Sequence, residues 1–339
     1  MRSISEKGKV LIYRPEIKDR IIRLIPREIG IDDASTFRGF CSAHERMFYP
    51  LDKNGITTLR DALLQSYRCL AKWLDNDRTA QAHTDAVIDS LKDLIPDEFR
   101  QVVNEHQSIN PDIPNVMTRV MYEILERILT KETDKEESTI QACNEITSDL
   151  MLLYHRLDYQ LPLAMNARNL LAFRYDAECR FFCVFCILVP EEEKTDVLVL
   201  LDGGHIAEIS GFDVRWFWAN LCTHEIAMLE YIETIMMSCE EWCIRPSAIY
   251  KLSPLKKANI DFDLRYKCFN SKFFDLIHYT IFEDIWNALI IKETNEKIKK
   301  IANEKNLYCP SLPTEEEIAK AELDMSNKIH HFLRQGELY

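Results

Sequence analysis

The sequence predicts an α+β protein that is predominantly helical, with a small antiparallel sheet around residues 170–210. Two observations lead to this class. Glycine is scarce, with 8 residues among 339, which argues against all-β sandwiches and against glycine-rich nucleotide loops. Residues 57–160 carry apolar side chains mostly at helical spacing, whereas residues 180–201 hold continuous β-branched and aromatic runs typical of buried strands.

We expect four regions that form one or two cooperative domains. They are an N-terminal motif segment at 1–57, a helical region at 58–165, a sheet with a long helix at 166–251, and a C-terminal helical region at 252–339. These boundaries follow changes in the spacing of apolar residues, because glycine and proline are too scarce to mark flexible linkers.

The N-terminal part contains one predicted strand and several predicted helices. Lys9–Tyr13 reads as a short strand. The isoleucines between Pro15 and Pro26 have helical spacing, and residues 36–52 read as a compact turn. Aromatic side chains should pack that turn, namely Phe37, Phe40, Phe48 and Tyr49. Further helices are predicted at residues 59–74, 79–95, 97–106, 111–131 and 136–160.

The second half alternates between strands and helices. Strands are predicted at 180–188 and 196–201, and Asp202-Gly203-Gly204 predicts a hairpin turn into a third strand at 205–209. Helices are predicted at 213–237, from Ser253-Pro254 onward, and within 272–291. Thr314 to Glu317 has the pattern of a capping box, and Gly336 is the expected end of that last helix.

Net charge and cysteine content indicate the cellular compartment and the class of binding partner. The net charge of −13 disfavours nucleic acid, and the two basic stretches, at 14–27 and 292–305, are interleaved with acids and read as solvated helix faces. The longest apolar run is about half of the ~20 residues that a membrane span needs. Because no signal segment precedes the 11 cysteines, we expect thiols and a cytoplasmic protein with an unidentified protein partner.

Cys41-x-x-His44 is the candidate site. A thiolate and an imidazole three residues apart on a tight turn can face one zinc ion, but they supply only two of its four ligands. The other interpretation is that Cys41 is buried between aromatic rings and that His44 caps a turn. We expect this packing role and therefore no resident cofactor. Zinc held by Cys41 and His44 is the alternative.

The other cysteine patterns predict packing. Cys183 and Cys186 lie three apart in a strand, so their side chains point to opposite faces and do not converge on a metal. Cys222 and His224 lie two apart in a predicted helix and diverge. Cysteine–histidine nucleophilic catalysis by Cys41 or Cys222 is conceivable, but the order of residues indicates no base for either thiol.

The stretch at residues 40–52 is similar to a known sequence group. Its pattern is Phe-Cys-x-x-His-acid, then aromatic-x-Pro-hydrophobic-acid, and a second stretch, Glu-Trp-Cys-Ile-x-Pro-Ser, follows at 241–247. Together they resemble a family of bacterial proteins without an assigned activity. In some members an upstream Cys-x-x-Cys and His cluster resembles the zinc module of HNH-type nucleases. The resemblance covers roughly residues 1–60 and 240–260.

The resemblance implies a function only in outline. Met1 stands where the upstream cluster would end, so either the metal-binding half has been lost or the true start lies further upstream. Glu45 and Asp52 stand where the family pattern has Asp and Glu. We therefore expect a non-catalytic accessory or interaction protein of the bacterial cytoplasm, from a mobile or defence locus. The alternative is a zinc-dependent HNH-like nuclease or a truncated remnant of one, with Cys41 and His44 as ligands.

Overall fold

The computed structural model describes most of the chain and divides it into two compact units. Described are residues 2–18, 21–35, 40–91, 113–131, 138–175, 178–202, 213–239, 241–266, 277, 279–308 and 311–323. The first unit comprises residues 1–36, 141–171 and 184–322, and the second comprises 37–140, 172–183 and 323–339. The predicted helix at 97–106, the hairpin from 202 to 209 and Gly336 lie wholly or largely outside the described residues.

The described strands are β1 (Lys9–Lys18), β2 (Ile21–Gly30), β3 (Cys143–Glu145), β4 (Met151–Leu157), β5 (Leu163–Tyr175), β6 (Glu178–Pro190), β7 (Thr195–Leu201) and β8 (Trp242–Ile244). The described helices are the 3-10 turn η1 (Arg2–Ile4), α1 (Ile31–Ser35), α2 (Ser42–Asn54), α3 (Leu59–Leu91), α5 (Ile113–Lys131), α7 (Val214–Thr223), α8 (Glu225–Met237), α9 (Pro246–Tyr250), α10 (Pro254–Tyr266), α11 (Glu283–Lys292) and α12 (Glu296–Leu307). A further helical stretch covers residues 315–323.

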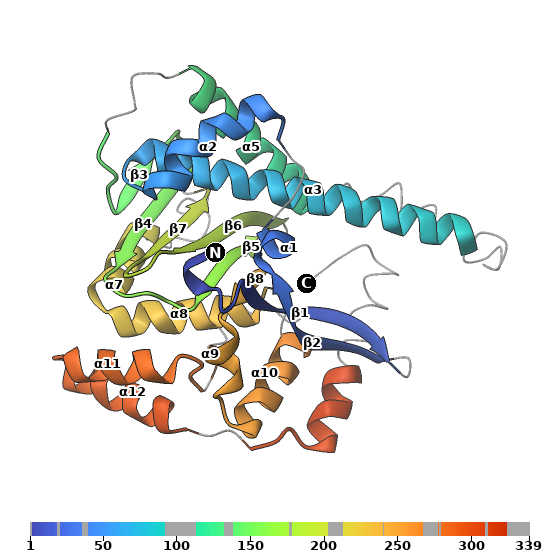
Figure 1. Ribbon diagram of the computed structural model, residues 1–339, viewed down its shortest axis with the longest axis vertical. Helices are drawn as coiled ribbons and strands as arrows, with labels where there is room; N and C mark the ends of the chain where they lie inside the picture. The colour runs from blue at the N-terminus through green and yellow to red at the C-terminus, as the bar shows by residue number, and fades with distance from the viewer. Residues whose placement is uncertain are drawn as a thin grey trace. The chain divides into compact units, whose positions relative to one another are not determined.

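An eight-stranded antiparallel sheet dominates the fold, in the order β2-β1-β8-β5-β6-β7-β4-β3 (Figure 1). The prediction of a small sheet around residues 170–210 is therefore wrong, because the strands are drawn from Lys9 to Ile244. Five of the eight strands, β2, β3, β4, β5 and β8, were not predicted, because local apolar spacing does not reveal their pairing.

Two predicted helices of the first unit are strands. Residues 15–18 belong to β1 and residues 21–26 to β2, and these antiparallel strands pair Lys9 with Gly30 and Lys18 with Ile21. Isoleucine is β-branched and favours strands, which outweighs a helical spacing of only four residues. Similarly, the predicted helix at 136–160 contains β3 and β4, and residues Met151 to Leu153 of β4 are all buried, as in a strand covered on both faces.

The strands that the sequence predicted near the centre of the sheet are confirmed. β6 lies between β5 and β7, and its residues from Cys183 to Leu188 are all buried. All seven residues of β7 are buried too. Continuous apolar runs therefore identified these strands correctly because both faces of the sheet are covered there.

Helices cover the sheet of the first unit in successive layers. α7 and α8 replace the single predicted helix at 213–237, with His224 between them. α8 is apolar around most of its circumference, and it lies between the sheet on one side and α11 and α12 on the other (Figure 1). Of the predicted core helix within 272–291, the described residues 279–282 are not helical, and α11 begins at Glu283.

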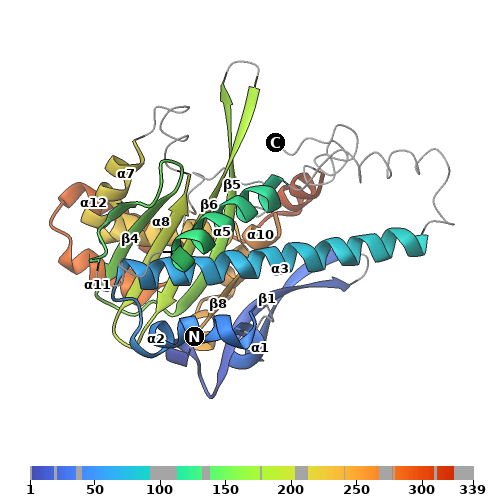
Figure 2. The same cartoon turned by 90° about the horizontal axis from the view of Figure 1, so that it is seen from above.

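The second unit is built on α2, α3 and α5. α3 is a single helix of 33 residues and replaces two predicted helices. It runs antiparallel to α5, because Arg60 Nη2 lies 3.4 Å from Leu129 O while Tyr67 stacks on Tyr122 with ring centroids 4.5 Å apart (Figure 2). Within the described ranges, none of the helices combines the length and the apolar character that crossing a bilayer requires.

Candidate functional site

Cys41 and His44 lie together at the start of α2, in the second unit. Cys41 is the N-cap residue with extended backbone, φ −79° and ψ 164°, and its carbonyl accepts the N–H of Glu45 at 3.0 Å. His44 follows on the first helical turn, so its Nδ1 lies 3.3 Å from Cys41 Sγ. Both side chains are exposed. Cys41 and His44 therefore lie side by side at the start of a helix rather than on the predicted turn.

The aromatic packing beside this pair differs partly from the prediction. Phe40 lies 4.9 Å from Phe48 and 5.6 Å from Tyr67, measured between ring centroids, and Phe48 is completely buried. Tyr49 is 67% exposed and takes no part, and Phe37 lies outside the described residues. The segment is therefore a helix fixed to α3 by Phe40 and Phe48, and Cys41 is exposed rather than buried between rings.

The start and end of α2 and α3 explain why this region is ordered as helix. Gly55 ends α2 with φ 72°, a left-handed conformation that glycine adopts without strain, and its N–H donates to Leu51 O. α3 starts where Asp61 Oδ2 accepts N–H and O–H groups of Thr57 and Thr58 at 2.8–3.0 Å. Burial raises the pKa of Asp61, but these donors outweigh it and lower the pKa below the ordinary value.

The pair fits one edge of a tetrahedral zinc site. Zinc bonds of about 2.3 Å to sulfur and about 2.0 Å to nitrogen place two such ligand atoms about 3.6 Å apart, close to the 3.3 Å between Sγ and Nδ1. In the part of the chain that the structure describes, no group of three or more His, Cys, Asp or Glu side chains is placed to hold a metal. The described residues thus supply two of four ligands, and the metal site stays a prediction.

The other cysteine patterns occupy packed positions. Cys183 and Cys186 are completely buried in β6, and burial raises the pKa of Cys186. Burial likewise raises the pKa of Cys222 to about 11, so this thiol is a poor nucleophile near neutral pH. His224 Nδ1 lies 3.7 Å from Glu293 Oε2. Each of the eight cysteines whose side chains the structure describes is a thiol, as predicted.

Sequence reasoning missed a buried carboxylate in the first unit. Glu233 of α8 is completely buried, and its Oε1 accepts hydrogen bonds from Ile281 N at 2.8 Å, Phe282 N at 3.0 Å and Trp286 Nε1 at 3.1 Å. Ile281 and Phe282 donate their backbone N–H groups just before α11, and Trp286 donates its indole N–H from within it, so Glu233 caps that helix from another element. Burial raises the pKa of Glu233 to about 7, an effect that these donors only partly offset. A lone acid inside the apolar run 231–237 was the available signal.

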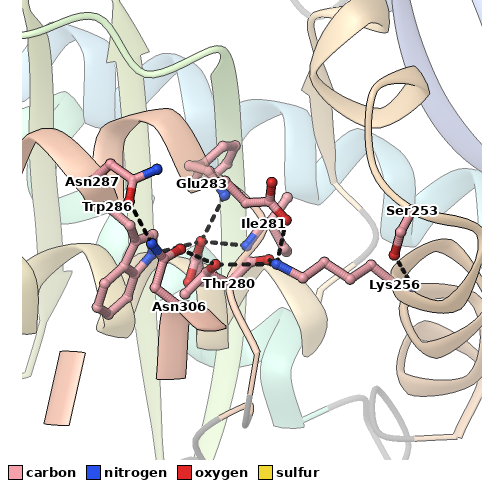
Figure 3. A network of polar contacts seen from close by, with 10 residues as sticks. Ser253, Lys256, Thr280, Ile281, Glu283, Trp286, Asn287 and Asn306 are labelled. Atoms are coloured by element: carbon pink, nitrogen blue, oxygen red, sulfur yellow. Dashed lines mark hydrogen bonds and ion pairs between the residues drawn. The ribbon is translucent and has the colours of Figure 1, made fainter. Parts of the chain in front are cut away.

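A buried lysine holds the same segment from α10 (Figure 3). Lys256 is 3% exposed, and its Nζ donates to Thr280 O at 3.0 Å and to the Glu283 carboxylate. Thr280 Oγ1 lies 3.0 Å from Asn306 Oδ1 of α12. Ser253 Oγ accepts the N–H of Lys256 at 3.2 Å, which confirms the predicted cap of α10. The network therefore links three helices around the residues that precede α11.

A third polar cluster lies within the sheet. Asp196 of β7 is completely buried and receives two hydrogen bonds from Arg156 of β4, at 2.7 and 3.2 Å, and one from Tyr154 at 2.7 Å. Arg156 and Asp196 are directly opposite in the strand register. The carboxylate is thus fully paired, and its partners come from the neighbouring strand.

Comparisons of the chain with protein-family models, with curated proteins and with solved structures gave no match. The resemblance of residues 40–52 to a bacterial family therefore stays a prediction. Function has to be argued from the surfaces and side-chain clusters described above.

Proposed function

We propose that this chain is a non-catalytic accessory or interaction protein of the bacterial cytoplasm, and that it binds a protein partner through the outer side of α11 and α12. The observation that carries the proposal is the exposure of large apolar side chains there. Ile291 is 79% exposed, Ile301 63% and Leu307 81%. The three side chains lie on two helices that contact each other, and large apolar side chains exposed on neighbouring helices favour a protein–protein contact site.

The inner side of the same helices is held in place by contacts with α8, as expected for a preformed binding surface. Glu233 caps α11 from α8, and Lys305 of α12 lies 2.7 Å from Glu230, also of α8. Lys305 Nζ is in addition 5.4 Å from the centroid of the Trp286 ring. A surface that is fixed in advance loses little conformational entropy when a partner binds.

The polar groups buried in this unit support a non-catalytic role. Glu233 accepts three N–H donors, Asp196 is paired with Arg156, and Lys256 is paired with Glu283. Each group therefore holds two elements together. A net charge of −13 also favours a protein partner over nucleic acid.

The test is cross-linking at defined positions in bacterial cells. A photo-reactive amino acid at Ile291, Ile301 or Leu307 should give a discrete adduct with a protein. The same amino acid at Glu192, an exposed residue of the β6–β7 turn, should give none. Adducts of equal yield at all four positions, or none at the three apolar ones, would contradict the proposal.

A zinc-dependent, HNH-like enzyme is the second candidate, favoured by the 3.3 Å distance between Cys41 Sγ and His44 Nδ1. Elemental analysis of the purified chain should decide it. About one zinc per chain, lost in both Cys41→Ser and His44→Ala, together with metal-dependent nuclease activity, would put this candidate first. Metal-free protein that melts normally would exclude it.

A further inference from the structure

One side of α12 carries a stripe of exposed residues. Lys297, Ile301 and Glu304 follow at intervals of four and three, which places them on the same side of the helix. All three are exposed. Ala302, on the opposite side, is buried. The stripe is therefore the solvent side of a helix whose other side is already packed.

The charges along this stripe would pair with those of a second copy of the helix that runs in the opposite direction. Lys297 lies two turns before Glu304, with Ile301 between them. When a second copy of the helix lies alongside in the antiparallel direction, Lys297 of each copy faces Glu304 of the other, and the two Ile301 side chains meet near the two-fold axis. Glu304 is also 4.0 Å from Lys300, but an exposed pair at that distance contributes little and competes weakly.

We propose that α12 is a self-association surface, on which a second copy of this chain docks in the antiparallel direction. The proposal rests on the proposed function, because it names the partner of the same surface. Isologous contacts of this kind close into a dimer rather than a filament.

The charge of the whole chain favours this helix over other self-contacts. Copies with a net charge of −13 repel one another over most of their surface. α12 contains four lysines and two glutamates, so it does not add to the negative charge that drives copies apart. A helix of 12 residues is only about 18 Å long, and the contact is smaller than a standard interface. We therefore expect a dissociation constant between about 1 µM and about 1 mM.

Charge reversal tests the pairing. Lys297→Glu and Glu304→Lys should each weaken the dimer at least about tenfold in sedimentation equilibrium, because each turns both attractive contacts into repulsive ones. Neither change should harm the helix, since an acid near its start and a base near its end both favour the helix dipole. Lys320→Glu, an exposed charge reversal in the stretch 315–323, is the matched control and should leave the dimer unchanged.

Rescue makes the test specific to this geometry. The double variant Lys297→Glu/Glu304→Lys restores opposite charges and should dimerise like the wild type. A one-to-one mixture of the two single variants should also dimerise, because a chain with two acids then faces a chain with two lysines. A structural defect in either single variant would not be repaired by mixing.

Three results would overturn the proposal: a wild type that is monomeric up to about 1 mM, single variants that dimerise normally, or a mixture that stays monomeric. These results leave the proposed function intact when the cross-linker at Ile301 captures a different protein. If neither a second copy nor another protein is captured at Ile301, both proposals fail together.

Discussion

Two carboxylates of the first unit are both completely buried, but they interact with different kinds of group. Asp196 in the sheet and Glu233 in α8 are both 0% exposed. Arg156 meets Asp196 with two hydrogen bonds, and Tyr154 adds a third. Glu233 instead has three N–H donors on Oε1, whereas its Oε2 accepts no hydrogen bond from the described residues.

The difference shows that satisfying hydrogen bonds and balancing a charge are separate requirements. Asp196 obtains a full positive charge from the strand opposite. Glu233 receives neutral donors, and Lys305, the cation that acts on it, is hydrogen-bonded to Glu230. Burial therefore raises the pKa of Glu233 to about 7, so that this group titrates near neutral pH.

The largest expected effect is the loss of the charge pair in the sheet. Asp196→Ala should lower the free energy of unfolding by about 3–5 kcal/mol, because it removes the completely buried carboxylate that accepts two hydrogen bonds from Arg156 and one from Tyr154. Chemical denaturation measures this. The double variant Asp196→Ala/Arg156→Leu should recover part of the loss. A single variant as stable as the wild type would show that the pair does not hold β4 to β7.

Glu233 should make stability depend on pH in the range where it titrates. Its pKa is raised from 4.5 to about 7 in the folded state, so its stabilising contribution is complete below about pH 4.5 and is lost as the pH rises through about 7. Glu233→Gln keeps the acceptor for the three N–H donors and removes the titration. The wild type should lose on the order of 3 kcal/mol relative to this variant between pH 4.5 and pH 9.

The control for this titration is Glu192→Gln, which removes an exposed carboxylate of the same unit. Its unfolding is measured over the same pH range as that of the wild type and of Glu233→Gln. If the unfolding free energy of Glu233→Gln changes with pH in the same way as that of the wild type, Glu233 is ionised throughout this range. The contrast drawn between Glu233 and Asp196 would then be wrong.

Lys305 should tune the same titration by a smaller amount. Its positive charge lowers the pKa of Glu233, against the larger effect of burial. Lys305→Met should therefore raise the pKa of Glu233. The double variant Lys305→Met/Glu233→Gln is compared with Lys305→Met alone, and the midpoint of their difference in unfolding free energy should move to a higher pH. An unchanged midpoint would mean that Lys305 serves only Glu230, from which it is 2.7 Å away.

The sequence could predict those elements whose signals are local. Continuous apolar runs predicted β6 and β7. The spacing of Cys41 and His44 allowed their side chains to lie close together, as they do. The helix around them was missed because Pro50, usually a helix breaker, lies inside α2.

The rest depended on pairings that no local pattern contains. β4 was taken for helix because its apolar residues also fit a helical period, and only its register with β7, about 40 residues later, decides between the two. The same register places Arg156 opposite Asp196. The donors to Glu233 come from residues 281–286, so its role became visible only in three dimensions.

The exposed carboxylate of Glu317 differs from Glu233 in that its pKa is lowered rather than raised. Glu317 Oε2 accepts the N–H of Thr314 at 2.7 Å and its hydroxyl at 2.9 Å, while Glu317 N donates to Thr314 Oγ1 at 3.2 Å, which confirms the predicted capping box. The N–H and the hydroxyl of Thr314 lower the pKa of Glu317. Its contribution is therefore present above about pH 4.5 and is lost as the pH falls through the lowered value, the reverse of Glu233.

Thr314→Ala removes the hydroxyl and keeps the N–H, so the pKa of Glu317 should move back toward its ordinary value without reaching it. An NMR titration of the Glu317 side chain measures this shift, and amide exchange in residues 315–323 should quicken at the same time. Thr314→Ser, which keeps a hydroxyl, should leave both measurements near the wild type. A Glu317 titration that is identical in Thr314→Ala would show that the hydroxyl does not reach the carboxylate in solution, and that the backbone N–H alone sets its pKa.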